Sequence, residues 1–289
     1  MLKLWDLKGN LLNTFKNHTD QINASSFSED GKLLASASDD KTVKIWKSDG
    51  TLLNTLSHEK KVNSVSFSLD SKFIISGSDD KTAKFWQQNG ILLKTLSHED
   101  KVNSVAISSS GKLIASASDD KKVKIWRHDG KLMNTLSHDD KVKTVKFSPD
   151  SKFIASASED GIVKLWTSDG KEITVIKGTS RLQPNIQFSP DSKMLGIKAG
   201  QSSNFNLHMV DGVWVKDWFL AQSYSFSDFL FYPDAKLIAT ASENEIKYLD
   251  LTLDRLIEHG CSWLRDYLTN NPNIDKDDRK LCDDIPTQK

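Results

Sequence analysis

The sequence repeats itself with a period of 40 residues, and this period constrains the fold more than any other feature of the chain. Four tryptophans stand 40 residues apart, at Trp46, Trp86, Trp126 and Trp166. A histidine, a serine and an aspartate precede each of them by 28, 10 and 6 residues. A period near 40 with several short apolar runs is typical of arrays in which every repeat forms one small β-sheet. The chain must therefore be counted in repeats rather than in conventional domains.

One repeat, from residue 100 to 137, shows how the period is built. Its predicted strands are the β-rich runs 102–107, 113–117, 123–126 and 132–136. Polar turns separate them, and Asp129-Gly130 predicts a two-residue hairpin turn of type I′, in which both central residues take positive φ. Equivalent pairs recur at Asp49-Gly50, Asn89-Gly90, Asp169-Gly170 and Asp211-Gly212. We therefore expect four antiparallel strands in every repeat.

These repeated residues resemble the WD-repeat β-propeller family, over residues 1 to about 250 and most specifically in four repeats. The resemblance implies an all-β propeller of four-stranded antiparallel blades, with a buried hydrogen-bonded tetrad in each blade. The implied tetrads are His18–Ser36–Asp40–Trp46, His58–Ser76–Asp80–Trp86, His98–Ser116–Asp120–Trp126 and His138–Ser156–Asp160–Trp166. Tryptophan only donates, aspartate only accepts, and serine and histidine do both, so such a chain can satisfy every polar group in a buried site.

The pattern weakens at both ends of the array. Phe188-Ser189-Pro190-Asp191 and Phe231-Tyr232-Pro233-Asp234 mark a fifth and a sixth repeat, but apolar or amide residues replace most tetrad members there: Ile197, Gln201 and Leu207, then Thr240, Asn244 and Leu249. We expect these blades to depend on apolar packing, as terminal repeats often do. An alternative is that aromatic residues form a distinct binding surface there, namely Trp214, Trp218, Phe219 and Tyr224.

The first residues match only the second half of a repeat. Lys3–Trp5 corresponds to a third strand and Leu11–Phe15 to a fourth strand, without the two strands that should precede them. Either these strands close a ring against the sixth repeat, or the chain is the C-terminal part of a longer array. We therefore predict six recognisable repeats plus part of another, with a propeller over residues 1–250.

Serine, histidine and aspartate together also raise the alternative of a hydrolase. Catalysis needs one preorganised pocket, whereas this trio occurs four times at fixed distances from a tryptophan, so we expect no enzyme. No zinc-ligand spacing, phosphate loop or dinucleotide fingerprint occurs, so we expect no metal and no cofactor. The two cysteines, Cys261 and Cys282, are expected to be reduced and partly buried.

Composition narrows the class of partner. The 39 basic and 39 acidic residues give no net charge, so no long-range field draws the chain to nucleic acid or to a membrane surface. No apolar stretch approaches the roughly 20 residues of a membrane helix. The N-terminus lacks the apolar core of a signal peptide, so a cytoplasmic location is expected.

The remaining partner class is protein, and the resemblance places its site on the loops that carry the tetrad histidines and aspartates. The candidate partner-binding residues are Lys61, Lys101, Lys141, Asp39, Asp79, Asp119, Glu159, Asn63, Asn103 and Lys143. The alternative is an ordinary solvated face, since exposed ion pairs are weak. We expect a module that is monomeric and binds a protein whose identity the sequence does not give.

Residues 251–289 have a different composition. Apolar residues at three- and four-residue steps predict a short helical cap that ends near Asn270-Asn271-Pro272. The string from Cys261 to Ile285 resembles the segment that follows WD repeats in bacterial multidomain signalling proteins of the STAND type. The resemblance implies a non-catalytic scaffold or sensor module, or a detached regulatory fragment of a larger signalling NTPase.

Overall fold

The computed structural model describes residues 1–6, 8–177, 185–198, 205–210, 228–231, 233–234, 237–241 and 246–250. It divides into two compact parts, Met1–Ser225 and Phe226–Lys289. The described residues form strands and turns, which confirms the predicted all-β class. No helix among these residues has the length and apolar character that a membrane crossing requires. The predicted helical cap at 251–289 lies outside the described residues.

Four sheets of the first part each contain four consecutive antiparallel strands, as the repeat predicts. The first sheet contains β3 (Ile22–Phe27), β4 (Leu33–Ser38), β5 (Thr42–Lys47) and β6 (Leu52–Ser57). The second contains β7 (Val62–Phe67), β8 (Phe73–Ser78), β9 (Thr82–Gln87) and β10 (Leu92–Ser97). The third contains β11 (Val102–Ile107), β12 (Leu113–Ser118), β13 (Lys122–Arg127) and β14 (Leu132–Ser137). The fourth contains β15 (Val142–Phe147), β16 (Phe153–Ser158), β17 (Ile162–Thr167) and β18 (Glu172–Lys177).

The remaining sheets are smaller. The N-terminal pair is β1 (Leu2–Trp5) with β2 (Leu11–Phe15), and the fifth repeat forms β19 (Asn185–Phe188), β20 (Met194–Lys198) and β21 (Phe205–Met209). The second part contains one described sheet of three strands, β22 (Asp228–Phe231), β23 (Leu237–Ala241) and β24 (Ile246–Asp250).

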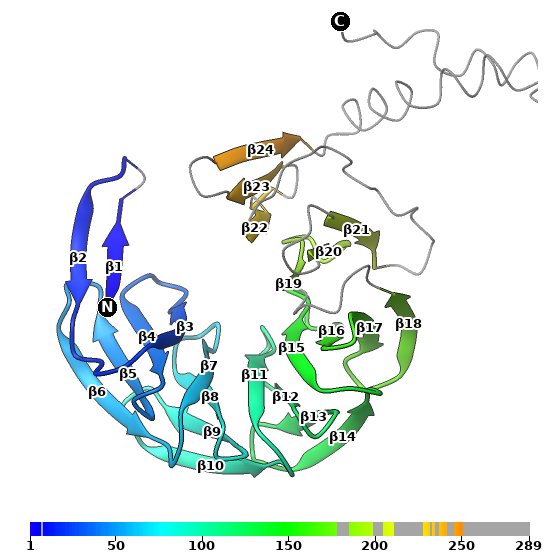
Figure 1. Cartoon of the computed structure of the whole chain (residues 1–289), viewed down its shortest axis with the longest axis horizontal. Coiled ribbons are helices and arrows are strands. Elements are labelled where there is room, and N and C mark those ends of the chain that lie inside the picture. Colours follow the sequence, from blue (N-terminus) through cyan, green and yellow to red (C-terminus); the bar gives the residue numbers. More distant parts are fainter. Residues whose placement is uncertain are drawn as a thin grey trace, which may run out of the picture. The chain divides into compact units, whose positions relative to one another are not determined.

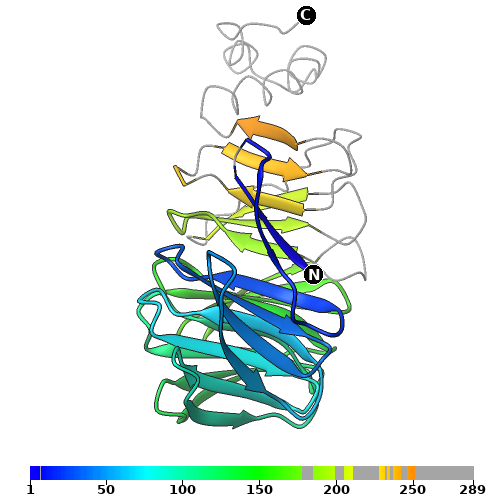
Figure 2. The same ribbon diagram turned by 90° about the vertical axis from the view of Figure 1, so that its left-hand side faces the viewer.

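In the first part, the four-stranded sheets follow one another around an arc, with β3, β7, β11 and β15 on the inner side (Figures 1 and 2). These first strands contact one another in sequence order. The fourth strands, β6, β10, β14 and β18, lie on the outer side and are mostly exposed. This succession of four-stranded antiparallel sheets has the arrangement of propeller blades.

The apolar core lies between neighbouring sheets rather than within one of them. Side chains of β4 and β5, such as Ala37 and Ile45, share a cluster with Val62, Val65 and Ile74 of the next sheet. The second strand of each sheet is packed on both faces, and every residue of β4 is buried. This packing explains why small residues recur along the second strands, because larger side chains there would hold neighbouring sheets apart.

The hairpin turn between the third and fourth strands differs from the predicted type I′. In the third sheet only Gly130 has positive φ, 90°, while Asp129 does not. The turn spans Arg127–Gly130, with the Gly130 N–H donating to the Arg127 carbonyl oxygen at 2.9 Å. The strand register then shifts by one residue at Trp126. Glycine thus occupies the left-handed position of a β-bulge, and the aspartate avoids left-handed strain.

Candidate functional site

The structure brings the four predicted tetrad residues of the third sheet together. The Trp126 indole Nε1–H donates to Ser116 Oγ at 2.8 Å. Ser116 Oγ also lies 2.7 Å from His98 Nε2, and His98 Nδ1 lies 2.8 Å from Asp120 Oδ2. The residues come from β13, β12, the loop before β11 and the turn after β12. One continuous hydrogen-bonded chain therefore crosses the sheet from its third strand to its edge.

Donor and acceptor capacities give this chain a direction. An ionised carboxylate only accepts, so His98 must carry its proton on Nδ1 and donate it to Asp120. A neutral imidazole then has a bare Nε2, which accepts the Ser116 hydroxyl proton. The serine oxygen accepts the proton of the Trp126 indole. Every polar atom of the chain is thus satisfied without a net charge on the imidazole.

The same chain recurs in the first and second sheets. In the first, distances of 2.6 to 2.9 Å join His18 to Asp40, His18 to Ser36 and Trp46 to Ser36. In the second, the equivalent distances are 2.8 and 2.9 Å. Threonines extend both chains, because the Thr42 and Thr82 hydroxyls donate to the aspartates at 2.6 Å.

The proton arrangement agrees with the direction of the pKa shifts. Burial raises the pKa of Asp120, but hydrogen bonds from His98 and from two backbone N–H groups outweigh burial and lower the pKa to about 2. Burial also raises the pKa values of Asp40 and Asp80, but hydrogen bonds from the Thr42 and Thr82 hydroxyls and from the histidines outweigh burial, so the net shift is downward. Burial lowers the pKa of His58 in spite of the neighbouring Asp80 carboxylate. In the second sheet an ionised Asp80 thus faces a neutral His58.

The fourth sheet departs from the predicted tetrad. His138 Nε2 lies 2.7 Å from Ser156 Oγ, and Trp166 donates to Ser156 at 2.8 Å. However, His138 Nδ1 faces Ser158 Oγ at 3.2 Å, and the Ser158 hydroxyl donates to Asp160. In the first three sheets the equivalent serine instead donates to the backbone of the loop before the first strand. The rotated Ser158 hydroxyl therefore separates Asp160 from His138 and makes a chain of five members.

This substitution of a hydroxyl for a carboxylate changes the electrostatics of His138. Burial lowers its pKa to about 4, and the Lys164 ammonium adds to this effect. The direction of the chain is unchanged, because Ser158 accepts from Nδ1 and donates onward to Asp160. His138 is therefore neutral in the folded protein well below the ordinary pKa of histidine.

The serine–histidine–aspartate geometry resembles the triad of a hydrolase, but the serines are inaccessible. Ser36, Ser76, Ser116 and Ser156 have no exposed surface. Each already accepts an indole N–H and donates to a histidine, so none has a free lone pair directed at solvent. A nucleophile must reach its substrate, and these four hydroxyls cannot. The trio is part of the sheet interior.

The candidate partner-binding residues lie on the histidine face, which we define as the loops before the first strands, the first two residues of those strands, and the turns between second and third strands. Asn63 Nδ2 donates to Asp79 Oδ1 at 2.8 Å and to the Val102 carbonyl of the next sheet at 2.9 Å. Asn103 bonds equivalently to Asp119 and Val142. Asn23, which the sequence analysis missed, does the same with Asp39 and Val62. These asparagines therefore join neighbouring sheets.

Three lysines of this face are more exposed than the aspartates that they approach. Lys61 and Lys101 both lie near Asp79 Oδ2, at 3.8 and 3.5 Å, and Lys141 lies 3.8 Å from Asp119. The lysine side chains are 46 to 48% exposed, whereas Asp79 and Asp119 are 11 and 8% exposed. Such distant pairs hold the ammonium groups only weakly. The three lysine ends thus stand above the part-buried Asp79 and Asp119, while other carboxylates of the face, such as Glu99 and Glu159, are exposed.

Lys143 replaces the asparagine in the fourth repeat and behaves differently. Its ammonium bonds to Asp119 Oδ1 at 2.7 Å and pairs with Glu159 at 3.3 Å. Burial lowers the pKa of Lys143, but the bond to Asp119 outweighs burial and the net shift is upward. Beside this pair the face is hollowed by a cavity of about 480 Å³, lined by Asp140, Lys141, Glu159 and Asp160.

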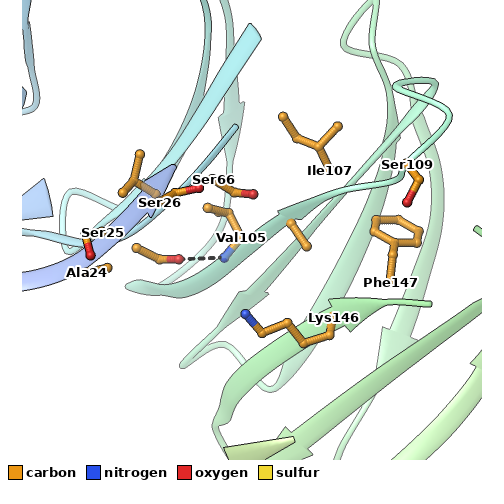
Figure 3. Close-up of a pocket in the computed structure, with 12 residues that line it drawn as sticks. Ala24, Ser25, Ser26, Ser66, Val105, Ile107, Ser109, Lys146 and Phe147 are labelled. Carbon is orange, nitrogen blue, oxygen red and sulfur yellow. Dashed lines mark hydrogen bonds between the residues drawn. The ribbon is translucent and has the colours of Figure 1, made fainter. Parts of the chain in front are cut away.

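A second cavity, of about 300 Å³, lies between the first strands on the inner side of the arc (Figure 3). Its wall includes Ser26, Ser66, Val105 and Phe147. Ser64 Oγ accepts the backbone N–H of Val105 from the adjacent sheet at 3.2 Å, and Ser104 accepts from Val145 at 3.3 Å. The serines of these strands therefore join neighbouring sheets, as the asparagines do.

Sequence reasoning also missed a lysine on each third strand. Lys84, Lys124 and Lys164 hold their ammonium groups 5.3 to 5.7 Å from the ring centres of the tetrad tryptophans. The same groups donate to carbonyl oxygens of Ser57, Ser97 and Ser137. Their spacing of 40 residues was a signal for this role, since it matches that of the tryptophans.

In the fifth repeat, the described residues that replace tetrad members are apolar and buried. Ile197 and Leu207 are 2 and 8% exposed, and Ile197 packs with Ile186 and Leu195. Trp214, Trp218, Phe219, Tyr224, Gln201, Asn244, Cys261 and Cys282 lie outside the described residues.

Successive four-stranded antiparallel sheets with hydrogen-bonded interiors define a repeat protein. A family model, described as WD domain, G-beta repeat, matches residues 9–47, 50–87, 90–127 and 130–167, which is more than half of the chain. The chain belongs to the WD-repeat family.

Curated relatives match a shorter stretch. The chain is 44% identical over 57 residues to the nuclear distribution protein PAC1 of Tuber melanosporum, and 39% identical over 59 residues to nudF of Aspergillus terreus. These alignments cover 19 and 20% of this chain. They span 13% of the length of each relative, so the similarity shown is one between repeats and not between whole proteins.

Proposed function

We propose that the chain is a protein-interaction scaffold whose partner binds the histidine face. The observation that carries the proposal is the row of half-exposed lysines, Lys61, Lys101 and Lys141, above the part-buried Asp79 and Asp119. The floor is rigid because Asn63 and Asn103 tie each carboxylate to the next sheet. A partner can therefore bind the lysine ammonium groups without displacing Asp79 and Asp119 beneath them. The cavity beside Glu159 adds a concave region to this face.

The proposal extends to the architecture. We propose a propeller over residues 1–250, formed by six repeats and part of another, followed by a helical cap at 251–289. The tetrads are its structural residues and hold each blade together. The weaker alternative of a hydrolase is disfavoured because all four serines are buried. A cytoplasmic location and the absence of cofactors are part of the same proposal.

A second candidate is that the chain serves as the sensor module of a larger bacterial signalling NTPase. The string from Cys261 to Ile285 favours it through its resemblance to such proteins. The matched relatives are named nuclear distribution proteins. The alignments cover too small a part of their length for that role to be transferred to this chain. Mass spectrometry of the native chain and the reading frame upstream of Met1 would test this candidate; a native mass equal to 289 residues would contradict it.

The binding face is tested by reversing three charges. Lys61, Lys101 and Lys141 changed together to Glu should leave the melting curve nearly unchanged, because exposed pairs contribute about 0–1 kcal/mol each. The variant should lose partners that the wild type captures in a pull-down followed by mass spectrometry. The matched control changes Lys32, Lys72 and Lys152, which lie in the turns between the first and second strands of the first, second and fourth sheets and are 73 to 79% exposed. Equal loss of captured partners in both variants would show that capture depends on net charge alone. Unchanged capture in both variants would show that the binding site is not on the histidine face.

A further inference from the structure

Two lysines of the histidine face approach one carboxylate oxygen from neighbouring sheets. Lys61, in the loop before β7, lies 3.8 Å from Asp79 Oδ2, and Lys101, in the loop before β11, lies 3.5 Å from the same atom. The two ammonium groups are therefore close enough to one another to share a second carboxylate. Both side chains are about half exposed, so such a carboxylate can reach them from solvent.

Asp79 does not satisfy these two ammonium groups by itself. Its Oδ1 accepts from Asn63 Nδ2 at 2.8 Å, and its backbone N–H donates to the Lys61 carbonyl oxygen at 3.0 Å, so the carboxylate is held in place. Both ammonium groups lie beyond the usual hydrogen-bond distance of about 3 Å from it. No hydrogen bond joins either of them to the residues that the structure describes. Because an ammonium group has three donors, the pair presents donors to solvent above a fixed carboxylate.

The charge of this group of three side chains favours a singly charged anion. Two ammonium groups and one carboxylate leave one positive charge in excess, which one further carboxylate neutralises. A phosphate monoester carries about −1.5 to −2 charges at pH 7, so it would leave the group with a negative charge. The group therefore fits the side chain of an aspartate or a glutamate better than a phosphorylated residue.

The other carboxylates of the two loops do not neutralise these lysines. Glu99 pairs with Lys122 at 3.3 Å, and Asp100 Oδ1 accepts the backbone N–H of Lys101 at 2.9 Å. Glu59 is exposed and is followed in the chain by a further lysine. Asp79 is therefore the carboxylate with which a carboxylate of the partner competes.

Lys141 holds the equivalent position in the fourth repeat, but it belongs to a neutral group. It lies 3.8 Å from Asp119, which Lys143 binds at 2.7 Å, and Lys143 also pairs with Glu159 at 3.3 Å. Two ammonium groups thus face two carboxylates, and no charge is left in excess. Lys141 therefore serves as an internal control for an anion site at Lys61 and Lys101.

We propose that Lys61 and Lys101 together bind one side-chain carboxylate of an acidic segment in the protein partner. The inference rests on the proposed function, because it names the chemistry that the histidine face recognises. The carboxylate enters from solvent and accepts one hydrogen bond from each ammonium group, above Asp79 Oδ2. Because exposed ion pairs are weak, the site contributes more to the choice of partner than to affinity.

The first test uses labelled hexaglutamate as the probe, with the full chain at low ionic strength. Fluorescence anisotropy should give the wild type a dissociation constant below about 1 mM. Lys61→Gln and Lys101→Gln should each raise this constant about tenfold, because a charge-assisted hydrogen bond is lost. Lys141→Gln should change it less than about twofold. Unchanged melting curves verify that the variants are folded. Equal effects of all three changes, or a wild type that does not bind hexaglutamate, would overturn the proposal.

The second test removes the competing carboxylate. Asp79→Asn keeps the shape of the side chain and an oxygen that accepts from Asn63, and it should tighten hexaglutamate binding about fivefold. The matched control is Asp39→Asn. Asp39 accepts from Asn23 at 2.6 Å in the same way, but no lysine pairs with it in the described part of the chain. Equal tightening in both variants would show that net charge alone governs binding and would refute a site at Lys61 and Lys101.

Two further peptides identify the chemistry of the ligand. Hexaglutamine should not bind, and hexaglutamine with one phosphoserine in place of a glutamine should bind no more tightly than hexaglutamate. Tighter binding of the phosphopeptide would assign the lysine pair to a phosphorylated partner and contradict the carboxylate.

The pull-down with Lys61, Lys101 and Lys141 changed to Glu separates this inference from the proposed function. Suppose that the variant loses its captured partners while hexaglutamate binding does not depend on Lys61 or Lys101. The histidine face would then remain the binding site, and only the carboxylate would be refuted. Unchanged capture by the variant would instead contradict the proposed function, and this inference with it.

Discussion

At the scale of single residues, the hydrogen-bonded chain inside each sheet explains why four residue types recur together. Ser116 is the central member, because it accepts from Trp126 and donates to His98. Only a hydroxyl can do both in so small a volume. The fourth sheet shows that the chain tolerates an added hydroxyl, Ser158, provided that the direction of donation is kept.

Trp126 is predicted to be a major source of stability. Its side chain is 7% exposed and fills the space between the third sheet and its neighbour. Trp126→Ala should lower the free energy of unfolding by about 3–5 kcal/mol, as large-to-small core changes do, and it also leaves Ser116 without its donor. The control is Trp5→Ala, since Trp5 is 51% exposed, and this change should cost about 1 kcal/mol or less. Urea unfolding measures both, and similar losses would contradict the buried role of Trp126.

His138 is predicted to make stability depend on pH. The folded pKa is about 4, below the ordinary value of 6.5, so the unfolded chain binds a proton first as the pH falls. The contribution is therefore complete above pH 6.5 and is lost between pH 6.5 and about 4. The gap between these values corresponds to about 3 kcal/mol at most.

Urea unfolding at pH 7 and at pH 4.5 tests this expectation. The wild type should lose stability between the two, and His138→Gln, which cannot be protonated, should lose less. Since His138→Gln also alters the hydrogen-bonded chain, the difference between the two pH values is compared rather than stability itself. An equal loss in both proteins would show that His138 does not contribute to the pH dependence.

At the scale of strands and sheets, the interfaces between neighbours are defined by small residues. The second strands carry alanine at Ala37, Ala117 and Ala157, but Gly77 occupies this position in β8. A Cβ at Gly77 would lie 2.8 Å from Val102 Cγ1 and 2.9 Å from Val105 Cγ1, closer than such atoms approach. β8 and β11 therefore lie too close for an alanine.

Gly77→Ala is predicted to destabilise the protein, although a comparison of repeats suggests the opposite. A glycine in a strand normally weakens it, so alanine should help. Here the added methyl meets two buried, β-branched side chains, and overpacking should cost about 1–3 kcal/mol. A second change, Val102→Ala, should remove much of the added cost, so the double variant should be more stable than the sum of the single losses implies. Thermal melts measure all three variants, and a stabilising Gly77→Ala would contradict this packing.

At the scale of the whole molecule, the repeats of the first part form a scaffold because each four-stranded sheet is joined to the next by hydrogen bonds and by apolar packing. Asn63 and Ser64 of β7 bond to the backbone of β11, and apolar clusters fill the space between the sheets. In such arrays stability is the sum of repeats and nearest-neighbour interfaces. The charges of the histidine face lie above these links, so this face can change its contacts while the scaffold stays intact.

Much of the fold of one repeat could be predicted from the sequence, because residues that meet within a repeat recur at the same 40-residue spacing. Strand number, strand order and the grouping of His98, Ser116, Asp120 and Trp126 are local to one repeat, and a repeated spacing reports local geometry. The hairpin turn was misjudged because Asp-Gly also suits a bulged turn with positive φ at glycine alone. The linking role of Asn23, Asn63 and Asn103 was missed because their second partners lie in the next repeat, 39 residues away.

The sequence by itself determined the family, the four-stranded unit and the four residues that the hydrogen-bonded chains share, since these depend on contacts within about 40 residues that recur in one register. Only the tertiary structure decided that Ser158 separates His138 from Asp160, that Gly77 leaves no room for a methyl group, and that Lys61, Lys101 and Lys141 are more exposed than the aspartates they approach. These features depend on rotamers and on the distance between two sheets, which spacing along a chain does not encode.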